Sequence, residues 1–498
     1  MFFHGPTATD SILANLTLNA PMGMDQIIYN AVKDWLKSDE RAWMITGERY
    51  YRDYPDIVFR KKYTIGADGK PVIVDNVANN KLVNNFTKKL VDQKVGYLLS
   101  KPLTVQTENT QYEELLTDTF FEKEFQRLLQ RVGKESIQKG KAWIHVYYDE
   151  NGEFKLKRIP SHEVIPLWKD ADHTELDAII RVYSYTTYEA QNRKEVTKVE
   201  YWDQSGVKRL IYQDDQVVPD IATYGNGWAS AHFTLMNPDE TEAPFNWTKV
   251  PFICFKYNAE ELPLLHQIKS LVDDYDKQKS DNSNNLEDTP NSIMVLKNYD
   301  GVDLGEFREK LTLYRAVKVT DDGGVDKLDV TINTEAHTKH QDQNRRDIYE
   351  FGRGVDTQAN NFGGDPSGIA LKFLYADLDM DCNLIETEYQ WAFEQLLWFI
   401  DVHLANSGQG DFSNEKVTFI FNRDIVINET EAVENAQKSV GILSDETVTA
   451  NHPWTTNTKD EMDRKAKEEA AAQTKFDQGQ YDGLPDEGGE DDDVDDGN

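Results

Sequence analysis

Cysteine is nearly missing from this chain: among 498 residues only Cys254 and Cys382 occur, far apart in the sequence. Disulfide frameworks and zinc clusters need several closely spaced cysteines, so the sequence excludes both and predicts two buried thiols in a reducing compartment. Long apolar runs are missing too. A membrane helix needs about 20 consecutive apolar residues, and the first residues lack the pattern of a secretion signal. We therefore expect synthesis in the cytoplasm and no membrane contact.

Positive charge is scarce as well, because 54 basic residues face 88 acidic ones and leave a net charge of −34. A protein that wraps DNA neutralises phosphates with lysine and arginine, so tight and general DNA binding is disfavoured. A surface past which DNA slides without sticking would also be negatively charged. So would an ordinary acidic protein, and composition alone does not separate the two.

The sequence carries no motif for nucleotide or acid–base chemistry. No G-x-x-x-x-G-K-[ST] loop occurs, and Gly66 and Gly69 stand just before Lys70 and Pro71, a pattern typical of a hairpin turn. The sequence FGRGVD at 351–356 lacks the glycine spacing of a dinucleotide site. The ten histidines are scattered, without a metal-ligand pair or a plausible Ser/His/Asp set. We therefore expect neither an enzyme nor a cofactor.

Four acidic residues copy the spacing of a calcium loop. Asp377, Asp379, Asp381 and Glu388 match its positions 1, 3, 5 and 12, but Cys382 replaces the glycine that makes its sharp turn. The segment also lies inside a strong helical pattern, where successive residues turn by about 100° and neighbouring aspartates point apart. We expect a solvated helix here and no metal. The same geometry argues against a metal-dependent nuclease.

The pattern of apolar residues predicts an α+β fold. Hydrophobic residues make up 39% of the chain and aromatic residues 11%, so nearly all of it can contribute to a core. The period changes from helical to alternating near residue 141, so 1–258 should form helices followed by a mainly antiparallel sheet. Asn151-Gly152 predicts a tight turn between the first two strands. The expected helices are 24–52, 78–99 and 112–139, and the expected strands are 141–159, 178–185, 196–202, 207–213 and 251–257.

The rest of the sequence predicts two helices around a small insertion, followed by one very long helix. After Tyr275 the helix at 263–288 keeps only one apolar residue, Leu286, before Pro290, so its second half should point into solvent or a polar lumen. The helix at 367–405 would be about 55–60 Å long. The other expected elements are an insertion of strands and a short helix at 292–332, a polar helix at 335–352, a glycine-rich loop at 354–368, a strand at 416–422, polar helices to about 473, and a disordered acidic tail.

One face of the polar helix at 335–352 carries groups that could contact a passing polymer. Lys339, Gln343 and Arg346 are spaced i, i+4 and i+7, which places them on the same side. Taken alone, these residues favour an ordinary exposed surface helix over a binding face.

Several blocks of sequence, found in a fixed order, carry a more specific signal. They are DWLKSDERAW with GERYYR at 34–52, DNVANNKLVNNFTKKLVDQKVGYLLSKP at 75–102, IPSHEVIPLW at 159–168, NSNNLED at 282–288, DIYEFGRGVD at 347–356, GDPSGIALKFLYADLDMDCN at 364–383, and FNRD with GILSDETV near 421–448. In these blocks the chain resembles the portal proteins of long-tailed phages that infect Gram-positive bacteria. The resemblance covers about residues 20–470, which leaves out the amino end and the acidic tail.

This resemblance implies a portal-type subunit that assembles into a ring. Such a subunit has a wing of helices and antiparallel sheet, a stem of two helices, a small α/β clip, a long wing helix and a helical crown. The resemblance places the wing at 1–258, the stem helices at 259–288 and 335–353, the clip at 289–334, the tunnel loop at 354–367, the long wing helix with a strand at 368–429, the crown at 430–475 and the acidic tail at 476–498. The polar stem helices would then face water and DNA rather than a core.

The implied function is passive conduction of DNA through a homododecamer at one capsid vertex of the virion. Double-stranded DNA would pass through the ring during genome packaging and ejection, with the work supplied by the terminase motor. Terminase, scaffold, the major capsid protein and the head-completion or adaptor proteins of the head-tail connector are the implied partners. Two alternatives stay open: another head structural or adaptor protein, and a packaging nuclease or ATPase.

For the channel, the resemblance implies weak contacts repeated around the ring, because strong phosphate pairing at every subunit would stall the DNA. Lys339 and Arg346 are the expected lumen cations, with Gln343 on the same helix face. The loop residues expected to touch the DNA backbone are Gln358, Asn360 and Asn361. The residues expected to act as loop hinges are Gly352, Gly354, Gly363, Gly364 and Gly368.

Overall fold

A computed structural model shows a mixed α and β protein whose sheets are antiparallel, as the sequence predicted. It describes residues 23–65, 69–74, 77–189, 191–236, 242–288, 292–297, 324–329, 334–358, 368–423, 429–450, 452–455 and 458–481. The chain divides into two compact units, Met1–Gln358 with Tyr375–Asp424, and Ala359–Leu374 with Ile425–Asn498. Among the described helices, none is both long and apolar enough to span a membrane. Of the expected disordered tail at 476–498, residues 476–481 belong to the last helix instead, and the remainder lies outside the described residues.

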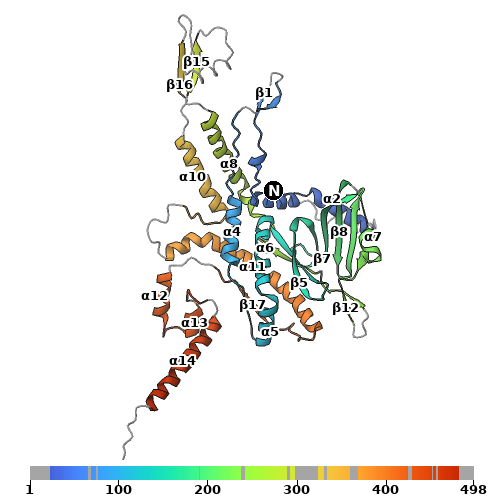
Figure 1. The fold of residues 1–498 in the computed structure, drawn as a ribbon, viewed down its shortest axis with the longest axis vertical. Coiled ribbons are helices and arrows are strands. Elements are labelled where there is room, and N and C mark those ends of the chain that lie inside the picture. Colours follow the sequence, from blue (N-terminus) through green and yellow to red (C-terminus); the bar gives the residue numbers. More distant parts are fainter. Residues whose placement is uncertain are drawn as a thin grey trace, which may run out of the picture. The chain divides into compact units, whose positions relative to one another are not determined.

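The largest sheet has the strand order β10-β9-β8-β7-β6, with β11 also paired to β9. Helix α2 (Met24–Lys37) covers one of its faces, where Ile28, Val32 and Trp35 pack against Ile180 and Val199 (Figure 1). Three of these strands, at 176–189, 192–203 and 206–213, lie where alternation predicted them, whereas β6, β10 and β11 were not predicted. Their bounds are β6 Val164–Trp168, β7 Leu176–Glu189, β8 Asn192–Asp203, β9 Gly206–Gln213, β10 Gln216–Pro219 and β11 Ala229–Ser230.

A second, three-stranded sheet has the order β14-β4-β5 and shares a core with the first through Trp143 and Trp202. Its first two strands are joined by five residues rather than by a two-residue turn. The Asp149 carboxylate accepts the backbone N–H groups of Asn151 and Glu153 at 2.9 Å, and Gly152 takes the positive φ of 78°. The bounds are β4 Lys141–Tyr148, β5 Phe154–Ile159 and β14 Phe252–Lys256, and a separate pair is formed by β12 Phe233–Met236 and β13 Glu242–Phe245.

The helices before the sheets are more broken than their periodicity suggested. The stretch 24–52 is divided at Ser38, whose backbone is extended and whose hydroxyl accepts the Arg41 N–H to cap the next helix. The stretch 112–139 contains a wide turn at Leu116–Phe120. The resulting elements are α3 Asp39–Tyr51, a 3-10 turn Asp56–Phe59, α4 Phe86–Leu99, α5 Thr110–Leu115, α6 Lys123–Lys139 and the short α7 Ile221–Tyr224.

The predicted long helix is present as α11 (Gly368–Asn406), whose 39 residues correspond to about 58 Å. Its buried side includes Tyr389 and Phe393, which contact Ser136 and Phe125 of α6. Beyond it, β17 (Val417–Ile420) pairs with β3 (Thr104–Thr107). In the second unit, α12 Glu429–Ser439, α13 Asp445–Ala450 and α14 Thr458–Tyr481 agree with the expected polar helices, and Lys465 of α14 binds Asp445 of α13.

Helices α8 (Leu264–Asp288) and α10 (Thr334–Phe351) lie side by side (Figure 1). Both agree with the predicted bounds to within a residue. The insertion between them holds an antiparallel pair, β15 (Ser292–Lys297) and β16 (Gly324–Asp329). The rest of the expected insertion, between 298 and 323, lies outside the described residues.

Residues 77–85, which we call the strap, run extended along α8 instead of forming the first turns of α4. Three alternate backbone N–H groups, those of Asn80, Leu82 and Asn84, donate to side chains of α8 at distances of 2.6, 3.0 and 2.9 Å. Their acceptors are Asn284, Ser280 and Asp276, spaced four residues apart along α8. Two extended residues rise about 6.6 Å and four helical residues about 6 Å, so the two registers match.

The strap corrects our expectation for the second half of α8. Asp276, Ser280 and Asn284 are buried, with 1%, 0% and 2% of their surface exposed, although we predicted that this half faces solvent or a lumen. Buried backbone N–H groups need hydrogen-bond acceptors, and the extended strap has no neighbouring strand among the described residues to supply them. The polar side chains on this face of α8 serve as the acceptors instead. The strap also explains why α4 begins at Phe86, capped by Asn85, rather than at residue 78.

The strap makes stability depend on the protonation of Asp276. Burial is the largest influence on this carboxyl and raises its pKa from 3.8 to about 6, while hydrogen bonds from Asn84 act in the opposite direction. The folded state therefore retains a proton that the unfolded chain releases near pH 4. Stability from this group declines as pH rises from about 4 to about 6 and stays lower above it.

We expect Asp276→Asn to remove this decline, because the amide oxygen still accepts the Asn84 N–H groups and carries no charge. Relative to the unchanged protein, the variant should gain about 1–3 kcal/mol of unfolding free energy between pH 4.5 and pH 7.5. Urea unfolding followed by circular dichroism at both pH values measures the difference. Identical pH dependence in the two proteins would contradict the assignment.

Candidate functional site

The exposed face of α10 brings together the three helix residues that the sequence singled out. Lys339, Gln343 and Arg346 are all exposed, and the opposite face of the helix packs against α8 through Asn344, which donates to the Leu271 carbonyl at 3.2 Å. The predicted separation of the two faces is therefore present. Gln341 and Asn344 are polar but buried, so a polar residue in this helix is not always exposed to solvent.

The two cations on this face are not equivalent. The Lys339 ammonium lies 2.6 Å from the Glu335 carboxylate one turn earlier, in a pair whose side chains are 75% and 78% exposed. Gln343 donates to Asp347 at 2.7 Å. Arg346 is exposed and has no ion pair or hydrogen bond with any residue that the structure describes. Arg346 thus presents the less neutralised charge.

The loop after α10 is fixed at its beginning. Arg345 forms two parallel hydrogen bonds of 2.7 Å with the Asp356 carboxylate. The guanidinium lowers the pKa of Asp356, and the carboxylate raises the pKa of Arg345. The Gln93 side chain of α4 donates to the Val355 carbonyl at 3.0 Å and accepts its N–H at 2.9 Å. The first residues of this loop are therefore fixed by hydrogen bonds to α10 and α4.

The structure describes only some of the other loop residues that were predicted to contact DNA or to act as hinges. Gln358 is exposed, and its backbone N–H donates to Asp356 at 3.0 Å. Gly368 is the first residue of α11. The predicted contact residues Asn360 and Asn361 and the predicted hinges Gly363 and Gly364 lie outside the described residues.

Gly352 and Gly354 have a packing role that the sequence did not reveal. A Cβ atom on Gly352 would lie 2.7 Å from Leu90 Cδ1, and one on Gly354 would lie 2.2 Å from Leu90 Cδ2. The left-handed backbone conformation at this turn falls on Arg353, with φ of 48°, and not on either glycine. Close contact with α4 accounts for Gly354, and contact with α4 together with the Ile348 carbonyl of α10 accounts for Gly352, while their role as hinges stays a prediction.

A buried ion pair ties this turn to the long helix. Lys94 of α4 has no exposed surface, and its ammonium donates to Asp381 of α11 at 2.8 Å and to the Arg353 carbonyl at 3.0 Å. Asp381 also accepts the Tyr257 hydroxyl at 3.0 Å and the Arg353 guanidinium at 3.2 Å. Burial, with help from Asp381, raises the pKa of Tyr257 well above its usual value.

The acidic residues that imitate a calcium loop are divided among different partners. Asp381 belongs to the Lys94 network, whereas Asp379 accepts from Tyr97 and pairs with Arg423. All of them lie within the continuous helix α11, as the periodicity predicted, but the expectation of a solvated helix is wrong for Asp381, which is buried. Within the described parts of the chain, no three histidine, cysteine or acidic side chains gather as metal ligands would.

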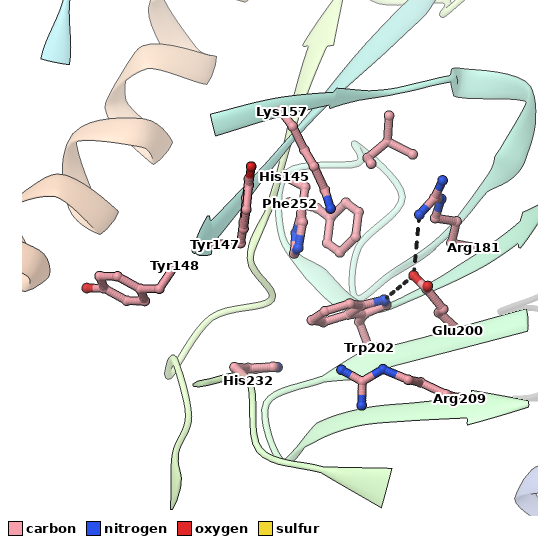
Figure 2. A pocket seen from close by; sticks show the side chains of 11 residues that line it. His145, Tyr147, Tyr148, Lys157, Arg181, Glu200, Trp202, Arg209, His232 and Phe252 are labelled. Carbon is pink, nitrogen blue, oxygen red and sulfur yellow. Dashed lines mark hydrogen bonds and ion pairs between the residues drawn. The ribbon is translucent and has the colours of Figure 1, made fainter. Parts of the chain in front are cut away.

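A cavity of about 230 Å³ opens between the two sheets of the first unit (Figure 2). Its lining includes histidines, but burial lowers the pKa of His145 to about 3 and also lowers that of His232, which makes both poor bases near neutral pH. Arg181 is held by Glu163 at 3.0 Å and Glu200 at 3.6 Å. These ion pairs join neighbouring strands of the larger sheet and the turn before β6, and nothing in their arrangement indicates a reaction.

Sequence reasoning missed Lys94, Gln93 and the strap. Lys94 left a signal, since it interrupts the apolar stripe formed by Leu90, Val91 and Val95 on α4. A lysine in such a position is buried only if it is paired, which predicts a carboxylate partner without naming it.

Comparison with known proteins gives concordant results. The family model described as "Phage portal protein, SPP1 Gp6-like" matches residues 37–475. The portal protein of Bacillus phage SPP1 is 30% identical over 458 residues, which cover 90% of this chain and 87% of that protein. The portal protein of Clostridium phage phiCD119 is 29% identical over 433 residues, covering 83% and 90%. Among solved structures, a chain from the neck of an empty GTA particle has a TM-score of 0.38 and 11% identity over 73% of this chain and 88% of that one.

The buried pair predicts a large effect of removing Lys94. We expect Lys94→Met to lower the unfolding free energy by about 3–5 kcal/mol, because it leaves the Asp381 carboxylate buried without its main cation. The double variant Lys94→Met/Asp381→Leu should recover part of this loss. Lys134→Met is the matched control, since Lys134 pairs with Asp92 at 2.8 Å on the surface and should change stability by less than about 1 kcal/mol. Urea unfolding midpoints decide the comparison, and equal effects at Lys94 and Lys134 would refute it.

The turn glycines allow a second prediction. Gly354→Ala should cost about 1–3 kcal/mol because the new methyl group overlaps Leu90. Gly96→Ala in α4 meets no atom within 4 Å and should instead gain up to about 1 kcal/mol from helix propensity. Thermal unfolding of both variants measures the contrast. If Gly354→Ala is as stable as the unchanged protein, the close contact does not exist in solution.

Proposed function

Because this chain belongs to the SPP1 Gp6-like family of phage portal proteins, we propose that α8 and α10 line the DNA channel of the portal ring. Portal proteins of this family form an oligomeric ring at the capsid vertex, as structural parts of the virion and not as enzymes. The observation that carries the channel proposal is the divided surface of α10. One face packs against α8, and the other exposes Lys339, Gln343 and Arg346 to solvent.

We extend the proposal to the parts of the subunit. The helices and sheets of 1–258, with the helix and strand of 368–429, serve as the wing. Helices 259–288 and 335–353 form the stem, 289–334 the clip, 354–367 the tunnel loop and 430–475 the crown. The agreement of α8, α10 and α11 with the expected helix bounds supports this division.

In the channel, Arg346 is the principal DNA contact of each subunit and Lys339 a weaker one. Lys339 already has Glu335 within 2.6 Å, so a passing phosphate competes with an existing partner. Gln343 and the loop residues Gln358, Asn360 and Asn361 add uncharged contacts to the DNA backbone. Weak and sparse attraction suits conduction, because a chain of net charge −34 holds DNA only where a local cation faces it.

The proposed assembly is a dodecamer that conducts double-stranded DNA during packaging and ejection. Its partners are terminase during packaging, scaffold and the major capsid protein during head assembly, and head-completion or adaptor proteins afterwards. The held start of the tunnel loop, through Arg345–Asp356 and Gln93–Val355, supports a loop that moves from a fixed base.

The channel proposal predicts unequal effects of the two cations. Arg346→Gln should weaken the contact of each subunit with DNA about fivefold at physiological salt, the size expected for one lost phosphate contact, and Lys339→Gln should have a smaller effect. In phage that carry each variant, the fraction of DNA-filled heads measures packaging and retention.

Lys155→Gln is the control, since Lys155 of β5 forms a similar exposed pair with Glu153 and is far from α10 in the chain. The proposal fails if Arg346→Gln fills heads as well as Lys155→Gln does. Purified protein also tests the rivals: metal-dependent DNA cleavage or nucleotide hydrolysis would favour a packaging enzyme, and particles without a central hole would favour another head protein.

A further inference from the structure

The hairpin of β1 (Tyr63–Ile65) and β2 (Pro71–Ile73) has one apolar face. The register pairs Tyr63 with Ile73 and Ile65 with Pro71, and directly opposed residues of two strands point to the same side. These four side chains, which we call the hairpin face, therefore lie together. Val72, whose backbone pairs with that of Thr64, points to the other side.

The hairpin face is uncovered in the single chain. Tyr63, Ile65 and Ile73 are 61%, 79% and 47% exposed, and Pro71 is exposed as well. The two strands form a sheet of their own, without a third strand among the described residues. An isolated two-stranded hairpin is marginally stable in water, so this one needs a covering surface. Contiguous exposed apolar groups of this kind mark interaction sites.

The residues on both sides of the hairpin are fixed by contacts with the rest of the subunit. Just before it, Arg60 pairs with Asp281 of α8 at 2.6 Å, and Ile57 is buried. Just after it, the strap bonds to α8 along its length, and Asn79 donates to the Arg60 carbonyl. Figure 1 shows the hairpin projecting beside α8. A surface held in this way is presented in one orientation, which favours a specific docking contact.

The charge of the hairpin differs in sign from that of the chain. Arg60, Lys61, Lys62 and Lys70 flank the two strands, in a protein whose net charge is −34. A second copy of the same chain offers the acidic surroundings that complement this basic segment. A duplex of DNA would attract the lysines but would leave the apolar face without a partner.

We propose that the hairpin face docks on the neighbouring subunit of the portal ring. A permanent neighbour covers the apolar side chains whenever the protein is assembled, and the family is built as such a ring. The contact buries Tyr63, Ile65 and Ile73 of one subunit, while the basic flanks approach acidic groups of the next. The contact supports assembly and is separate from the proposed contacts with DNA.

The test uses two aspartates on the hairpin face. Ile65→Asp/Ile73→Asp should raise the dissociation constant for ring assembly about tenfold or more, because each contact would bury unpaired charge. Sedimentation velocity and particle images measure the fraction of rings. Both side chains are exposed in the single chain, so circular dichroism should show unchanged secondary structure.

Val72→Asp is the matched control, since Val72 is 49% exposed on the opposite side of the same hairpin. It should assemble like the unchanged protein. If the double variant assembles normally, or if Val72→Asp disrupts rings equally, the proposal is overturned.

A second measurement does not depend on disrupting the ring. A photo-crosslinking amino acid in place of Tyr63 should join two copies of the chain in intact rings and leave added DNA unlabelled. Crosslinks confined to one chain, or formed with DNA, would overturn the docking of this face on a neighbour whatever the outcome for the channel residues.

Discussion

One buried ammonium group holds together the segments around the proposed channel. Lys94 lies on α4, its carboxylate partner Asp381 lies on α11, and the same ammonium binds the backbone of the turn after α10. A buried charge must be paired, so these three segments cannot separate without exposing or stranding it. The beginning of the loop after α10 is thereby fixed to α4, 259 residues earlier in the sequence, and to α11, the helix that follows the loop. The same contacts hold the end of α10 in place, and with it Arg346.

The same requirement, applied to hydrogen bonds, shapes α8. The strap buries backbone N–H groups that have no strand beside them, and α8 supplies oxygens from Asp276, Ser280 and Asn284 at a matching spacing. A helix can do this only by giving up apolar residues on that face. The polarity of this face of α8 therefore results from its neighbour within the subunit and not from the proposed lumen. The strap also orients the hairpin that precedes it.

These arrangements explain which features the sequence could predict. Apolar periodicity gave α8, α10, α11 and the main strands, because it reports which side of an element packs against apolar atoms. It does not distinguish a polar side that meets water from one that meets backbone. The strap residues are 192 to 204 positions away from their partners on α8, so no local pattern joins them. Lys94 could be suspected from its apolar stripe, whereas Asp381 was obscured by a spacing that imitates a calcium loop. Helical spacing together with the family resemblance predicted the site residues on α10. The difference between Lys339 and Arg346 could be recognised only from the structure, which shows Glu335 paired with Lys339.

Ring symmetry changes what a weak contact can do in the proposed channel. A single exposed arginine contributes little to binding a phosphate in water, but symmetry repeats it around the lumen at one height. DNA that leaves one guanidinium then meets an equivalent one, so its energy changes little as it advances. Neutralisation of Lys339 by Glu335 and the net charge of −34 keep the total attraction low. A lumen with many unpaired cations would bind DNA more tightly, but it would also raise the barrier to each step. The sparse charge on α10 is therefore consistent with conduction, in which small and repeated attractions are more useful than strong ones.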